Sequence, residues 1–250
     1  MLTLDSLKRT YDIPCRHNIT AGSRHILLIC HDLGENMEKN TVEAMATAAQ
    51  RDGISALAFD FPAHGRSGVG NAQLTVPNCL EDLGAVYDFA RKMAPDAEIS
   101  LAGLGMGANI VLLWMSQQNK RGGRTVKNVV LCGATVCMYS ALMKLCGGEE
   151  GAERWRRVGQ MTMSGDKTPK LPYGLLKDFE KNDAFQLFRK GKENYLFLHG
   201  SEDDVALPDD VRRFTHLYHL NLIELPGVGH FFDAPGDADR LAFEVISYIR

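Results

Sequence analysis

Short apolar runs alternate along this chain with longer segments whose apolar residues recur at helical spacing. The short runs predict buried strands, and the longer segments predict helices that cover them. The predicted strands comprise residues 25–30, 54–59, 99–102, 126–132, 195–199 and 221–225. The predicted helices comprise residues 38–51, 78–93, 108–117, 208–218 and 238–249. This alternation predicts one α/β domain, residues 1–250, built on a mostly parallel, doubly wound sheet.

One segment interrupts the alternation. Residues 135–192 separate two predicted strands, which is far more chain than a simple crossover needs. The segment is rich in Met, Lys and Gly and contains Pro169 and Pro172. Long insertions of this kind often form lids or binding loops, so we expect a small cap here within the single domain.

Composition narrows the function classes. The 250 residues are 45% hydrophobic and 24% charged, as in ordinary globular proteins. The formal net charge is −3 and no long basic run occurs, so we expect no nucleic-acid partner. No apolar run approaches the ~20 residues of a membrane span, and no signal peptide is recognisable, so we expect a cytoplasmic protein. Six cysteines without a C-x-x-C pair indicate reduced thiols.

Candidate chemistry lies where predicted strands end. Gly103-Leu104-Gly105-Met106-Gly107 follows one strand, and Gly200-Ser201-Glu202-Asp203 follows another. Gly229-His230-Phe231 follows the last strand after a short loop. Sites in open parallel sheets form outside the carboxyl ends of the strands, so these three segments are expected to meet.

These motifs resemble the α/β-hydrolase superfamily, in particular small feruloyl- or cinnamoyl-esterase-like and serine aminopeptidase-like members, over roughly residues 25–250. His31-Asp32-Leu33-Gly34 is similar to the oxyanion loop, and residues 60–68 are similar to the D…GHGxS turn. The resemblance implies an α/β-hydrolase fold and a small carboxylic ester or amide as ligand, with no metal or organic cofactor. It also implies Asp203 as the acid, His230 as the base, and the backbone N–H groups of Leu33 and Met106 as the oxyanion hole.

Gly105 stands where the superfamily pattern G-x-S-x-G has its nucleophilic serine. Without a side chain it has no hydroxyl, so the acyl-enzyme route is closed at this residue. The elbow is a strained turn that glycine adopts easily, so the fold should survive the replacement. Three explanations remain open: natural loss of the nucleophile, an engineered knockout, or a different residual chemistry. We therefore expect either an impaired esterase-like protein or a non-catalytic pseudo-hydrolase that binds a ligand or partner.

Asp32 is a second departure, because the superfamily usually has glycine beside the oxyanion loop. A carboxylate here should disfavour an oxyanion unless its side chain points away. His230 and Asp203 could still activate a water molecule as a general base, although without covalent catalysis.

A rival interpretation treats residues 103–108 as the dinucleotide-binding fingerprint G-x-G-x-x-A. Two features oppose it. The segment does not open the first strand–helix unit, and residues 126–134 lack the acidic residue that binds the ribose.

Further polar and sulfur-containing residues admit two interpretations each. His31 is expected to order the oxyanion loop, and His64 to form a turn. Asp204 could be mistaken for the acid Asp203. Cys132 or Cys137 could replace the serine, although a role in core or lid packing is the simpler interpretation.

Two remaining groups are weaker candidates. His216 and His219 could bind a metal from one helix end but have no evident third ligand. Four methionines could line an adaptable apolar pocket or simply pack the cap: Met138, Met143, Met161 and Met163.

Overall fold

The structure is a computed structural model that describes residues 2–163 and 169–250. Within these residues the main sheet has eight strands in the order β1-β2-β4-β3-β5-β6-β9-β10. The first two, β1 (Thr3–Lys8) and β2 (Asp12–His17), are antiparallel. The other six are parallel to one another: β3 (His25–Cys30), β4 (Ser55–Phe59), β5 (Glu98–Leu104), β6 (Asn128–Cys132), β9 (Asn194–Gly200) and β10 (Asn221–Leu225).

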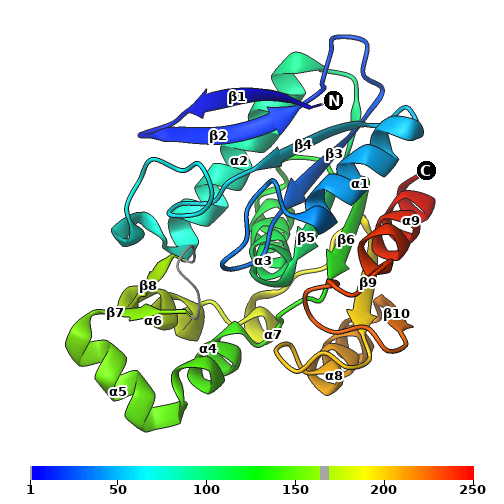
Figure 1. Cartoon of the computed structure of the whole chain (residues 1–250). Coiled ribbons are helices and arrows are strands. Elements are labelled where there is room, and N and C mark those ends of the chain that lie inside the picture. Colours follow the sequence, from blue (N-terminus) through cyan, green and yellow to red (C-terminus); the bar gives the residue numbers. More distant parts are fainter. Residues whose placement is uncertain (1, 164–168) are drawn as a thin grey trace.

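Helices cover both faces of this sheet (Figure 1). Leu28 of β3 and Leu101 of β5 face a core that includes α2 (Val76–Met93) and α3 (Gly105–Arg121), and α8 (Pro208–Tyr218) packs on the same face. Leu27 and Ala102 face the opposite core, formed with α1 (Asn40–Arg51) and α9 (Asp237–Ile249). Consecutive strand residues therefore serve opposite cores, which explains why these strands are apolar without alternation.

The chain between β6 and β9 forms a mainly helical segment. It contains α4 (Met138–Cys146), α5 (Gly148–Val158), α6 (Tyr173–Lys181), α7 (Ala184–Leu187) and the antiparallel pair β7 (Gln160–Thr162) and β8 (Lys170–Pro172). The buried Trp155 donates its Nε1–H to the carbonyl of Leu171 at 2.9 Å, which ties α5 to β8. In Figure 1 the arrowheads of β6 and β9 point toward the side of the molecule that holds α4. This segment occupies the place of the expected cap at 135–192, of which residues 164–168 lie outside the described chain.

The mostly parallel, doubly wound sheet is confirmed, with corrections at its edge and at helix starts. The hairpin β1–β2 was not predicted, because β1 buries only Leu7 and has no apolar pattern. Helix α2 begins at Val76 because the Thr75 hydroxyl accepts the N–H of Asn78 as an N-cap. Helix α3 begins at Gly105, three residues before the predicted start at Ala108. A short 3₁₀ turn covers Asn71–Gln73. In the described residues no helix is long and apolar enough to cross a membrane.

Candidate active site

Four strand ends meet at the carboxyl edge of the sheet and bring the predicted site residues together. The loop from His31 to Gly34 follows β3, and Gly105 follows β5 as the first residue of α3. Asp203 follows β9, and His230 follows β10. The side chains of Asp203 and His230 are buried, and both reach the same small region as Asp32.

Gly105 adopts a left-handed backbone conformation, with φ of +47°. A residue with a Cβ would be strained there by about 1–3 kcal/mol. A Cβ built on Gly105 would also overlap the carboxylate of Asp32. The backbone conformation and the neighbouring carboxylate therefore both favour glycine at this position.

The carboxylate of Asp32 lies between the two backbone N–H groups that the sequence predicts as an oxyanion hole. Its Oδ1 accepts the N–H of Leu33 at 2.6 Å and the N–H of Met106 at 2.6 Å. Its Oδ2 lies 3.0 Å from Nε2 of His230. We expected Asp32 to disfavour an oxyanion unless its side chain pointed away from these N–H groups, and it points toward them.

Asp203 orients His230 from the other side. Its Oδ2 lies 2.7 Å from Nδ1 of His230, and its Oδ1 accepts the N–H groups of Val205 and Ala206. Asp204 is exposed, so Asp203 is the carboxylate that contacts the imidazole. His230 thus bridges two carboxylates, one at each ring nitrogen.

The charges of this triad stabilise one another. Burial alone would lower the pKa of His230, but hydrogen bonds to Asp203 and Asp32 and their charges outweigh it and raise the pKa to about 10. Burial likewise works against ionised Asp32, yet His230 and the two backbone N–H groups hold its pKa below the ordinary value. At neutral pH His230 is therefore an imidazolium that faces the carboxylate of Asp32.

Residues 21–148, about half of the chain, match the family described as serine aminopeptidase, S33. The chain belongs to this family. Monoacylglycerol lipase ABHD2 from Danio rerio is 26% identical over 128 residues, which cover 49% of this chain and 28% of the relative. The human protein of the same name is 25% identical over 127 residues, covering 48% and 28%. This chain thus matches less than a third of the length of these curated relatives.

Solved α/β-hydrolase structures share the fold over nearly the whole chain. A putative hydrolase from Agrobacterium vitis S4 superposes with a TM-score of 0.84 at 19% identity, covering 100% of this chain and 99% of that one. Est1E from Butyrivibrio proteoclasticus, with ferulic acid bound, superposes with a TM-score of 0.81 at 17% identity, covering 98% and 99%. The predicted α/β-hydrolase fold is confirmed. The similar proteins named here are a lipase, a putative hydrolase and Est1E with bound ferulic acid.

Two buried histidines hold the segment 31–34 and the turn after β4 in this S33-family chain. His31 accepts the N–H of Phe61 at Nε2 and donates from Nδ1 to its neighbour's carbonyl at Asp32. His64 accepts the N–H of Gly34 at Nε2 and donates from Nδ1 to the carbonyl of Pro62. Burial lowers the pKa of His31 to about 4 and that of His64 to about 3, so both remain neutral. These contacts agree with the ordering and turn-forming roles expected from the sequence.

His199 is a site neighbour that the sequence interpretation missed. It is buried in β9, donates from Nε2 to the carbonyl of Ala206 at 2.8 Å, and lies 3.4 Å from Oδ2 of Asp203. Its place directly before Gly200, at the end of an apolar strand, is the signal that could have identified it.

The rival nucleophile and cofactor candidates do not fit the geometry. Burial raises the pKa of Cys137 to about 12 and that of Cys132 still higher, so neither thiol is activated. The N–H of Met106 at the start of α3 already donates to Asp32, so it cannot bind a dinucleotide phosphate while that contact holds.

The histidine and methionine candidates lie elsewhere. His216 and His219 are exposed at the end of α8, and the described residues contain no cluster of His, Cys and acidic side chains able to hold a metal ion. Met138 is buried in the core, and the other three cap methionines pack against it: Met143, Met161 and Met163.

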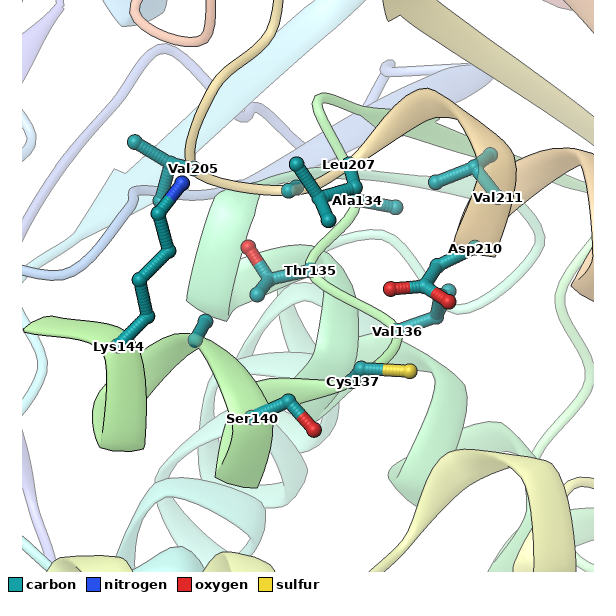
Figure 2. A pocket seen from close by; sticks show the side chains of 12 residues that line it. Ala134, Thr135, Val136, Cys137, Ser140, Lys144, Val205, Leu207, Asp210 and Val211 are labelled. Atoms are coloured by element: carbon teal, nitrogen blue, oxygen red, sulfur yellow. The ribbon is translucent and has the colours of Figure 1, made fainter. Parts of the chain in front are cut away.

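A cavity of about 50 Å³ lies between the chain segments that follow β6 and β9 (Figure 2). The loop 134–137 and α4 line one side, and the loop 205–207 and α8 line the other. Thr135 donates its N–H to the carbonyl of Gly105, and Ala206 donates its N–H to Asp203, so the walls connect directly to the site. Figure 2 shows Lys144 reaching toward Val205, with Cys137 and Asp210 on the other side.

Proposed function

We propose that this S33-family chain is a pseudo-hydrolase toward carboxylic esters and amides and keeps the site to bind a small ligand. The observation that carries the proposal is the Asp32 carboxylate, which is bonded to Leu33, Met106 and His230 at once. A protein side chain thus stands where a substrate's carbonyl oxygen would be polarised.

Serine-type acyl transfer needs a nucleophilic oxygen, an empty oxyanion hole and an unprotonated base. Gly105 supplies no oxygen, Asp32 fills the hole, and His230 holds a proton at neutral pH because its pKa is raised to about 10. The same proton argues against His230 as a general base for direct attack of water on an ester.

The cavity beside the site supports a ligand of modest size. A volume of about 50 Å³ accommodates a small group, not a whole acyl chain. Its walls include side chains of Val136, Val205 and Leu207, with Lys144 at one end. A small ester- or acid-like molecule with a short apolar part matches this lining. The names of similar proteins, a monoacylglycerol lipase and an esterase with bound ferulic acid, are in keeping with that class.

The decisive experiment compares three proteins on 4-nitrophenyl acetate and methyl ferulate: the wild type, Gly105→Ser, and Gly105→Ser with Asp32→Gly. We expect the wild type and Gly105→Ser to hydrolyse neither ester faster than buffer alone, because Asp32 remains between the two N–H groups. The double variant should gain activity, since one oxyanion-hole donor alone contributes about 10²–10³ in kcat.

Adding His230→Ala to the double variant should remove the gain, and Asp204→Asn serves as a matched control at an exposed neighbour. Ester hydrolysis by the wild type that His230→Ala abolishes would refute the proposal.

A further inference from the structure

An open groove of about 520 Å³ runs between helices α1 and α9, on the face of the sheet opposite α2 and α3. The two helices pack side by side (Figure 1). Arg250 pairs with Asp52 just beyond the end of α1, so the C-terminal ends of the two helices lie together. The helices therefore run in the same direction, and the groove follows both of them.

Phe243 lies in this groove at the middle of α9. It is the most exposed of the large apolar residues that the structure describes, at 67%. The rest of the lining includes small side chains, which let a second surface approach closely: Ala44, Thr47, Ala48, Ala242 and Ser247. A single exposed aromatic residue is common on protein surfaces, so the charges around Phe243 decide what this face can bind.

The two ends of the groove carry opposite charges. Glu43 and Asp239 line the end formed by the N-terminal halves of the helices, and Arg51 and Arg250 line the other end. Internal ion pairs satisfy two of these four charges: Arg16 with Glu43, and Asp52 with Arg250. Asp239 and Arg51 have no ion-pair partner among the described residues. One unpaired acid and one unpaired base therefore stand at opposite ends of the same groove.

We propose that this α1–α9 face binds the same face of a second copy of the chain and forms a two-fold symmetric dimer. An axis near Phe243 sets the α9 helices antiparallel, so the acidic end of each groove meets the basic end of the other. Asp239 then faces Arg51 of the partner subunit, and the helix dipoles of the two copies oppose each other. The charges favour a second copy over an unrelated protein, because one face carries both halves of the match.

Phe243 and the two unpaired charges have different roles in this dimer. At the axis the two phenyl rings lie against each other and against the small side chains of the grooves. A central aromatic residue that is shielded from water contributes much of the affinity of an interface. Exposed ion pairs contribute little attraction, but like charges brought together cost considerably more. Phe243 therefore supplies affinity, and Asp239 and Arg51 fix the orientation.

The dimer goes beyond the proposed function, because it uses none of the residues of the candidate active site. Helix α1 follows the segment that holds Asp32, and α9 follows the loop that holds His230. Each site thus lies on the side of its groove where both helices begin, which is the acidic end. Because the two-fold axis places the acidic ends at opposite ends of the interface, it keeps the two sites apart.

Sedimentation equilibrium of the intact protein tests the association. With rising concentration, the mass of the wild type should increase from that of one chain toward that of two, and no further. Phe243→Ser should raise the dissociation constant roughly 30-fold or more, as loss of a central aromatic residue does. Val158→Ser is the matched control, because Val158 is 65% exposed but lies in α5, away from the groove. This control should leave the dissociation constant unchanged.

Charge reversal tests the two-fold arrangement. Arg51→Glu and Asp239→Lys should each remain a single chain, because a dimer of either variant would contain two pairs of like charges. An equimolar mixture of the two variants should dimerise again, because both contacts of a mixed pair then join opposite charges. An apolar contact without this orientation would not produce the rescue.

A wild type that keeps the mass of one chain throughout would overturn the proposal and leave the groove to a different partner. A dimer that persists in Phe243→Ser, or a mixture of charge variants that fails to recover, would contradict it equally. None of these outcomes affects the pseudo-hydrolase proposal, which fails only if the wild type hydrolyses carboxylic esters. An unfolding midpoint near the wild-type value in each variant shows that lost association is not a lost fold.

Discussion

At the scale of single residues, Asp32 is a buried charge with every partner it needs. Two backbone N–H groups and an imidazolium share its oxygens, and the imidazolium is itself neutralised further by Asp203. Removing one member of such a group is costly, because it leaves a buried charge without compensation. Gly105 belongs to the same arrangement, since its missing side chain is the space that the carboxylate fills.

Gly105→Ser alone should therefore destabilise the protein instead of restoring it. The positive φ costs about 1–3 kcal/mol for a residue with a Cβ, and the overlap with Asp32 adds to that. The free energy of unfolding, measured by urea titration, should fall by at least about 2 kcal/mol. Adding Asp32→Gly removes the overlap. The double variant should therefore lose less free energy of unfolding than the sum of the losses of the two single variants. Strict additivity would show that the two positions do not interact.

The raised pKa of His230 predicts how stability depends on pH. Its folded pKa of about 10 exceeds the ordinary 6.5, so its contribution is fully present below pH 6.5 and is lost as the pH rises through 10. Asp32, with a lowered pKa, contributes above its ordinary 3.8 and loses this contribution as the pH falls through its folded pKa. The free energy of unfolding of the wild type, measured by urea titration, should be clearly lower at pH 9.5 than at pH 6.5.

Asp32→Asn should lose less stability over the same interval, because one of the two charges that retain the proton is gone. Buried thiols with raised pKa values, such as Cys30, also weaken the fold above their ordinary pKa of 9.0. The thiols affect both proteins equally. The difference between the two stability losses therefore reports the interaction between Asp32 and His230. Equal slopes for the two proteins would contradict the assigned charge state.

Most residues of the site could be predicted from sequence, but the direction of the Asp32 side chain could not. The motifs place Gly105, Asp203 and His230 at strand ends, and the structure brings them together with the N–H groups of Leu33 and Met106. The direction of the Asp32 side chain depends on donors from three separate segments, which no local pattern encodes. His199 was missed for a related reason, because only the folded sheet places it against Asp203.

At the scale of elements, the turn between β1 and β2 contacts α2 through the buried carboxylate of Asp82. The hydroxyl of Tyr11 donates to the carboxylate of Asp82 at 2.9 Å, and Arg9 pairs with the same carboxylate. Asp82 is fully buried, and burial, outweighing these partners, raises its pKa to about 6. The sequence pattern did not reveal the hairpin, because β1 buries only Leu7. The contact to Asp82 adds to the pairing of β2 with β4 and to the burial of Ile13 and Cys15 in the core.

Tyr11→Phe should destabilise the hairpin by about 1–3 kcal/mol, because a buried acceptor loses its donor. Lys8→Ala is the matched control in the same hairpin, since its ion pair with Asp12 is exposed and should contribute less than about 1 kcal/mol. Limited proteolysis of the first 20 residues, read with the urea midpoint, measures both. Equal effects of the two substitutions would show that the contact does not anchor the hairpin.

At the scale of the whole molecule, two cores on opposite faces of one sheet support the site. The accessibility of the cysteine thiols measures how tightly the molecule is packed. Five of the six cysteines are buried, and Cys137 is partly exposed. The apolar surroundings that bury these thiols also raise the pKa of Cys15 and Cys137 to about 12.

A thiol-reactive dye should therefore label one cysteine slowly in the folded protein and all six in denaturant. Cys137→Ser should abolish the native reaction, because this is the residue that solvent reaches. Rapid labelling of several thiols would show that the segment between β6 and β9 opens far more often than its buried contacts imply.

The steric relation between Asp32 and Gly105 also constrains the history of the site. A side chain at position 105 and an inward carboxylate at position 32 exclude each other, so the aspartate could enter only with or after the glycine. With both residues in place, a single change of Gly105 to serine is unfavourable. The path to an ordinary serine hydrolase then runs through two substitutions, and we expect neither alone to produce activity.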